Sequence, residues 1–206
     1  MARLRLPPLE RSVKAMEKKK SVQRCLLLLV GILPFLAGCS REGTKKIPTV
    51  SDLKSADKVI GVRFEMPGEK ENVSAASAFS LIGNDGEVDV RLLDRIGIKT
   101  AALNREQTSK LVAAVYGNHA ETPAFLCYKP HHVFLFYDED GELINTVEVC
   151  FDCIQIRTSP PVDETQPSGY DFKALALLCD EIGIGMSEGP LTSDDFVRWW
   201  DKEFDK

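Results

Sequence analysis

The segment "VFLFYDEDGELINTVEVCF", residues 133–151, constrains the fold of this chain more than any other stretch. Two runs rich in β-branched and aromatic residues flank the acidic turn at residues 138–141, a pattern typical of a β-hairpin. Gly141 suits the positive φ that a tight turn requires. The sequence therefore predicts a long antiparallel hairpin over about residues 131–156.

The length of the turn predicts which residues of the hairpin face one another. A three-residue loop over positions 139–141 pairs residues whose numbers sum to 280. This register places Val133 opposite Val147 and, further along, Cys127 opposite Cys153. Directly opposed residues in an antiparallel pair lie within the distance that a disulfide spans.

Shorter patterns predict the other elements. Further strands are expected over residues 57–66, 77–83, 87–96 and 98–103, and helices over residues 104–117, 172–183 and 193–204. Asn104 and Gln107 occupy the positions of a capping box, and Gly117 ends that helix. Residues 157–171 are expected to form a long loop. The predicted fold is α+β: an antiparallel sheet that includes the hairpin and packs against two or three helices.

An apolar segment near the N-terminus indicates export. Residues 25–36 are apolar, follow Lys18–Lys20 and Arg24, and precede the small residues Ala37 and Gly38. Twelve apolar residues are too few for a membrane-spanning helix, which needs about 20. A basic head, a short apolar run and small residues together predict a secretory signal peptide.

The end of this segment, Leu36-Ala37-Gly38-Cys39, resembles the lipobox of bacterial lipoproteins. The resemblance implies that signal peptidase II cleaves between Gly38 and Cys39 and that Cys39 carries the lipid. Several acyl chains on one residue hold a protein stably to a bilayer. In that family an aspartate after the cysteine retains the protein at the inner membrane. Ser40 therefore implies a place in the cell envelope at the outer membrane, where the cell has one.

The signal divides the chain into three parts. Residues 1–38 are expected to be an N-terminal extension and the lipoprotein signal peptide, with translation starting at Met16. Residues 39–56 are polar and are expected to be a flexible tether. Residues 57–206 are long enough to bury a core of their own and are expected to fold as one globular α+β domain.

The charge of the mature chain narrows its partners. The whole chain has a net charge of −5, and residues 1–38 hold eight basic and two acidic residues. The mature chain therefore has 18 basic and 29 acidic residues, which give it a net charge of −11. Such a surface disfavours nucleic acid and anionic lipid headgroups. The expected membrane contact is therefore the lipid on Cys39, and any other partner is a protein or a small molecule.

Four cysteines remain in the expected domain: Cys127, Cys150, Cys153 and Cys179. Export places them where disulfides persist. The hairpin register favours a Cys127–Cys153 bond. Because side chains alternate along a strand, Cys150 faces the other way, which favours a Cys150–Cys179 bond.

A zinc site is the alternative use of the same residues. Cys127, His131 or His132, Cys150 and Cys153 would supply the Cys₃His set that zinc favours. The stretch "CFDC" contains neither glycine nor proline to form the turn that both thiolates need, and on a straight strand Cys150 and Cys153 face apart. A redox pair of the thioredoxin type is less favoured, because that motif opens a helix. Two disulfides and no cofactor are therefore expected.

The sequence favours a binding or structural module over an enzyme. It contains no nucleophile elbow, no H-E-x-x-H motif and no glycine-rich phosphate loop. The patterns C-x-x-P-H-H and V-C-F-x-C, within residues 104–184, resemble exported bacterial proteins of unknown activity. That resemblance supports export and implies no reaction.

Overall fold

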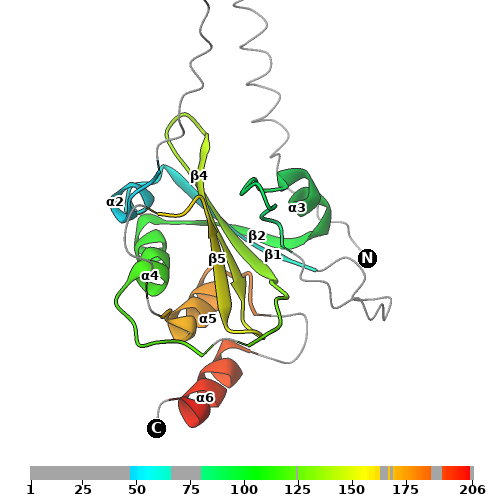
Figure 1. Cartoon of the computed structure of the whole chain (residues 1–206), viewed down its shortest axis with the longest axis vertical. Helices are drawn as coiled ribbons and strands as arrows, with labels where there is room; N and C mark the ends of the chain where they lie inside the picture. The colour runs from blue at the N-terminus through cyan, green and yellow to red at the C-terminus, as the bar shows by residue number, and fades with distance from the viewer. Residues whose placement is uncertain are drawn as a thin grey trace, which may run out of the picture. The chain divides into compact units, whose positions relative to one another are not determined.

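A five-stranded antiparallel sheet forms the centre of the fold (Figure 1). The computed structural model describes residues 47–65, 80–123, 125–162, 167, 169–186 and 192–204. The strands lie in the order β2-β1-β3-β4-β5. They span β1 Lys58–Phe64, β2 Gly97–Leu103, β3 His132–Tyr137, β4 Leu143–Cys150 and β5 Gln155–Ser159. The predicted α+β class with an antiparallel sheet is confirmed.

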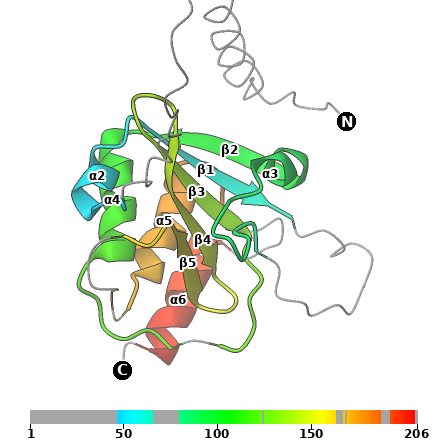
Figure 2. The same ribbon diagram turned by 45° about the horizontal axis from the view of Figure 1, so that its top comes forward.

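Most of the helices cover one face of this sheet. They are α2 Val50–Lys54, α4 Arg105–Tyr116, α5 Phe172–Glu181 and α6 Ser193–Glu203, whereas α3 Val90–Ile96 lies on the other side (Figures 1 and 2). Residues directly opposite one another share a face of the sheet, as Val59 and Phe136 do. The main core joins that face to the helices through Leu53, Leu111, Leu175, Phe134, Phe136, Val147 and Val149.

A side-chain cap starts each of the three long helices, and the cap of α4 is the one predicted above. Asn104 and Gln107 form the capping box of α4, and Gly117 is its C-cap. Asp171 accepts a hydrogen bond from the backbone N–H of Ala174 at the start of α5. Thr192 and Asp195 form a capping box at α6. Each cap satisfies N–H groups that have no partner inside the helix.

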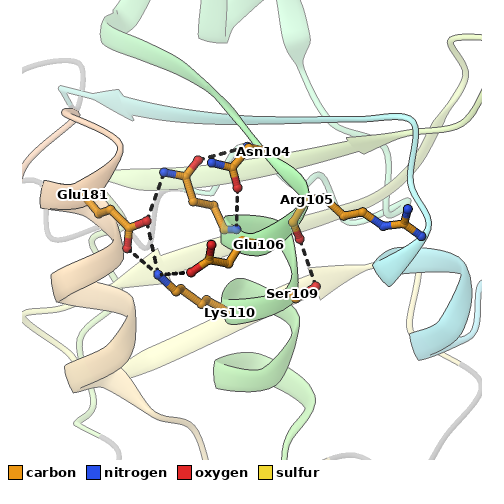
Figure 3. Close-up of polar contacts among 7 residues, drawn as sticks. Asn104, Arg105, Glu106, Ser109, Lys110 and Glu181 are labelled. Atoms are coloured by element: carbon orange, nitrogen blue, oxygen red, sulfur yellow. Dashed lines mark hydrogen bonds and ion pairs between the residues drawn. The ribbon is translucent and has the colours of Figure 1, made fainter.

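Polar contacts on the surface join α4 to α5 (Figure 3). The Lys110 ammonium lies 3.0 Å from one carboxylate oxygen of Glu181 and 3.1 Å from a carboxylate oxygen of Glu106. Gln107 donates a hydrogen bond of 3.1 Å to Glu181. These side chains are largely exposed, so water and salt weaken their attraction, and the buried contacts beneath hold the two helices together.

The strand predicted over residues 87–96 is wrong. Asp89 accepts a hydrogen bond of 2.8 Å from the backbone N–H of Leu92 and starts α3, which buries Leu93. The alternating start "EVDV" suggests a strand, but the capped helix that follows satisfies the backbone locally. Of the strand expected at residues 77–83, residues 77–79 lie outside the described residues, and Ile82 forms a single bridge with Val88.

The tether predicted to end at residue 56 also requires correction. Thr49 and Asp52 form a capping box, and α2 follows over Val50–Lys54. Leu53 is fully buried in the main core. The described fold therefore includes residues that sequence polarity assigns to the tether. Among the described residues, no helix has both the length and the hydropathy needed to cross a membrane.

The hairpin forms, but its register differs from the prediction by one residue. His132 faces Val149, Val133 faces Glu148, and a bulge lies between Phe136 and Tyr137. The three-residue loop forms as predicted: the backbone N–H of Asp138 donates a hydrogen bond of 3.1 Å to the carbonyl oxygen of Glu142, and Tyr137 faces Leu143. Gly141 has the expected positive φ of 78°. The bulge adds one residue to one strand and shifts every pair beyond it.

Candidate functional site

A turn at residues 151–154 interrupts the long strand that the sequence predicts through residue 156. The chain reverses between β4 and β5, and Ile154 adopts a positive φ of 49°. Gln155–Ser159 then returns as β5, so the loop expected from residue 157 begins later. Phe151 and Ile154 face the main core, whereas Cys150 and Cys153 pack with Tyr128 in a separate cluster. The turn therefore places both cysteines of "CFDC" on one side.

Cys153 is joined to Cys127 by a disulfide, with Cα atoms 5.5 Å apart. The sequence pairs these residues through an extended hairpin ladder, but β3 begins only at His132. Their meeting depends on the loop before β3, where the backbone N–H of Phe125 donates a hydrogen bond of 3.2 Å to the carbonyl oxygen of Cys153. The Gln155 side chain also bonds to the carbonyl oxygen of Phe125.

The structure does not contain the expected Cys150–Cys179 bond. Both thiols are free and fully buried. Cys150 packs with Tyr128 and Cys153, whereas Cys179 belongs to the main core beneath the helices. Burial raises the pKa of both thiols above the ordinary value. The prediction is wrong because β4 directs Cys150 away from the face that α5 covers.

Beside the cysteines, the buried carboxylate of Glu148 forms a second feature of the site. It is fully buried in β4 and accepts hydrogen bonds from the Ser80 hydroxyl (2.5 Å), the backbone N–H of Leu81 (2.5 Å) and the Tyr128 hydroxyl (3.0 Å). Burial and the charge of Glu148 raise the pKa of Tyr128. Three donors compensate the loss of water around one carboxylate, as a buried charge requires.

An arginine completes this polar cluster from the neighbouring strand. Arg157 on β5 lies opposite Glu148, and its guanidinium carbon is 3.9 Å from the centre of the Tyr128 ring. Glu148 is not among the site residues that the sequence predicts. In the structure, Ser80, Leu81 and Tyr128 cover its carboxylate. The one local signal for this site is the pair of opposite charges, Glu148 and Arg157, on adjacent strands.

The residues of the alternative zinc set do not converge. His132 bonds to the carbonyl oxygen of Gly185, and His131 lies 3.3 Å from the carbonyl oxygen of Phe64. Cys127 and Cys153 are bonded to one another, and Cys150 contacts the backbone of Lys129. Within the described part of the chain, no group of three or more His, Cys, Asp or Glu side chains is arranged to hold a metal ion.

A second buried polar group lies on the helix-covered side of the sheet. Arg63 on β1 and His132 on β3 lie opposite each other, and both are buried. Asp180 at the end of α5 accepts a hydrogen bond from the Ser193 hydroxyl of α6. Burial, followed by the charges of His131 and Arg63, lowers the pKa of His132 to about 4. The Asp180–Ser193 bond joins α5 to α6, and His132 bonds to Gly185 after α5.

The expected lipidation site, with Leu36, Gly38 and Cys39, lies outside the described residues, which begin at Ile47. The site that the structure does describe consists of Cys127, Tyr128, Glu148, Cys150, Cys153 and Arg157.

Comparisons with protein-family models, with curated proteins and with solved structures found no match to this chain.

Proposed function

We propose that this chain is a lipid-anchored protein of the bacterial cell envelope, whose folded part is a disulfide-stabilised binding or structural module. The observation that carries the proposal is the sequence Leu36-Ala37-Gly38-Cys39 behind a basic head and a short apolar run. A lipid on Cys39 anchors the chain, and the acidic charge of the mature protein keeps the remaining surface away from anionic headgroups.

The described fold supports this proposal in two ways. Its first helix begins at Val50, eleven positions after Cys39. Eleven residues reach at most about 40 Å when fully extended, at about 3.5 Å per residue. The module then works close to the membrane surface. The Cys127–Cys153 disulfide suits a compartment in which thiols are oxidised.

The experiment is metabolic labelling with an alkyne fatty acid in bacterial cells that express the full chain. The wild-type chain should take up the label and migrate as a shortened form in the membrane fraction. Cys39→Ser should lose the label and accumulate as the unprocessed precursor. Cys25→Ser is the matched control, because it removes a cysteine of the same segment outside the lipobox, and it should be labelled normally.

Two results would reject the anchor. One is a wild-type chain that takes up no label, and the other is a Cys39→Ser chain that is labelled and shortened like the wild type. Either result leaves the fold unchanged, so the module would then need another route to its compartment.

A further inference from the structure

The Cys127–Cys153 disulfide has one accessible end and one inaccessible end. Cys127 lies in an exposed loop beside Phe125, which is 46% exposed, and Leu126, which is fully exposed. Cys153 is fully buried. A reagent from solution therefore approaches this disulfide from the Cys127 side.

The free thiol of Cys150 lies behind the inaccessible end. It packs in one cluster with Cys153 and Tyr128. It accepts a hydrogen bond of 3.3 Å from the backbone N–H of Lys129 and donates one of 3.1 Å to the carbonyl oxygen of the same residue. Lys129 is two residues after Cys127, so the thiol lies between the two chain segments that the disulfide joins.

The turn at residues 151–154 brings Cys150 and Cys153 together. Cys150 ends β4 opposite Gln155, Cys153 lies within the turn that follows, and the two residues pack in one cluster with Tyr128. The backbone N–H groups of Cys153 and Asp152 also interact with the Cys150 sulfur. Burial raises the pKa of the Cys150 thiol, and these N–H groups act against that rise in favour of the thiolate, which is the form of cysteine that attacks a disulfide.

We infer that Cys127, Cys150 and Cys153 form a thiol–disulfide exchange centre, in which Cys153 alternates between two partners and Cys127 is the sulfur that reacts with disulfides from outside the protein. The centre uses only groups that the fold already holds. Its substrate class is a small-molecule or protein disulfide that reaches the exposed loop at Cys127.

The internal step is balanced without an added oxidant. The Cys150 thiolate attacks the Cys153 sulfur, which forms a Cys150–Cys153 bond and breaks the Cys127–Cys153 bond. Cys127 leaves as a thiolate and takes the proton that Cys150 has lost. In the external step the Cys127 thiolate attacks an incoming disulfide, forms a mixed disulfide with one half and releases the other half as a thiolate.

The inference rests on the proposed function in one respect, because the disulfide must first form in an oxidising compartment. The exchange itself is tested on the purified chain and does not depend on the lipid. Failure of lipidation and failure of exchange are therefore separate results.

The test uses the full chain purified without reductant and kept folded at neutral pH with N-ethylmaleimide, which traps free thiols. After digestion without reduction, mass spectrometry assigns the state of each cysteine. The expected product carries the label on Cys127 and contains a Cys150–Cys153 disulfide. With oxidised glutathione in place of the trap, glutathione should attach to Cys127. Absence of both adducts from Cys127 in the folded wild-type chain would overturn the inference.

Two variants identify the attacking thiol. Cys150→Ser should keep the Cys127–Cys153 bond and lose the label on Cys127. Cys179→Ser is the matched control, since it removes the other buried thiol from a different cluster, and it should be labelled like the wild type. Equal labelling of Cys127 in Cys150→Ser and in the wild type would overturn the inference, and so would loss of label in Cys179→Ser. Circular dichroism checks that each variant is folded.

Discussion

Nε2 of His132 donates a hydrogen bond of 2.8 Å to the carbonyl oxygen of Gly185 and so ties β3 to the residues that follow α5. A carbonyl oxygen only accepts, so the proton of the neutral ring lies on Nε2. Nδ1 is buried and has no hydrogen-bond partner among the described residues. A second proton on this ring would create a buried charge beside Arg63, which explains why the pKa of His132 is lowered to about 4.

This geometry predicts that the protein loses stability in mild acid. In the unfolded chain His132 has the ordinary histidine pKa of 6.5. Between pH 6.5 and 4 its ring is therefore protonated in the unfolded chain and neutral in the folded chain. The contribution of His132 to the free energy of unfolding is fully present above pH 6.5. It should fall by about 1.4 kcal/mol for each pH unit between 6.5 and 4, and level off below the folded-state pKa of about 4.

Urea unfolding at several pH values between 7 and 4 measures this effect. His132→Gln removes the titrating ring, so its free energy of unfolding should depend less steeply on pH than that of the wild type. His119→Gln changes a half-buried histidine in the segment after α4 and is the matched control, which should keep the wild-type slope. Equal slopes for the wild type and His132→Gln would contradict the prediction.

Replacing the buried carboxylate of Glu148 with an amide should lower the stability of the protein markedly. Glu148→Gln keeps the shape but replaces one acceptor oxygen with an NH₂ group that faces the donors of Ser80, Leu81 or Tyr128. The free energy of unfolding should fall by about 1–3 kcal/mol, because a buried donor is left without an acceptor. Glu142→Gln, in the exposed hairpin turn, should change it by less than about 0.5 kcal/mol. Urea midpoints compare the two, and equal midpoints would argue against the network.

Lys110 and Leu111 are adjacent in α4, so their variants compare the contributions of surface charge and of core packing to stability. Lys110→Ala removes the contacts with Glu106 and Glu181, which are solvated, and should barely change the thermal midpoint. Leu111 is fully buried, and Leu111→Ala should lower the free energy of unfolding by about 2–5 kcal/mol because it leaves a cavity. Thermal scans of both variants test the difference. A larger loss in Lys110→Ala would show that the ion pairs dominate.

Because of the disulfide, a reductant should lower the stability of the protein, whereas a chelator should not change it. Cys127 and Cys153 are 26 positions apart, and reduction frees the unfolded chain from that closed loop. Reduction should lower the free energy of unfolding by about 2–4 kcal/mol. A chelator such as EDTA should leave it unchanged.

Two variants check the origin of this response. Cys153→Ser removes the sulfur shared by both disulfide arrangements and should abolish the effect of reductant. Cys179→Ser should retain the effect. Unfolding caused by EDTA, together with bound zinc in the purified chain, would favour the zinc alternative over the disulfide.

Short-range signals made much of the fold predictable. Asn104 with Gln107, and the residues after Thr192, satisfy helix ends within a few positions, so sequence spacing alone identifies α4 and α6. Gly141 marks the hairpin turn, because the positive φ of a turn is also a local property of the backbone. The helix α3 is the exception. Its cap, Asp89, follows an alternating pattern that is equally typical of a strand.

The candidate site depended on contacts between distant parts of the chain. Periodicity places Cys150 apart from Cys153, because a strand alternates its side chains, and no sequence pattern identified Glu148. Tertiary packing decided both features: the turn at residues 151–154 gathers the cysteines, and Ser80 and Tyr128 cover Glu148. That turn packs Phe151 against Phe172 and Phe196, which lie more than twenty residues away in sequence. The sequence by itself determined the caps, the turn and the class of fold, since those interactions act over a few residues. The tertiary structure decided which faces are covered and which sulfurs meet, since burial is a property of the assembled core.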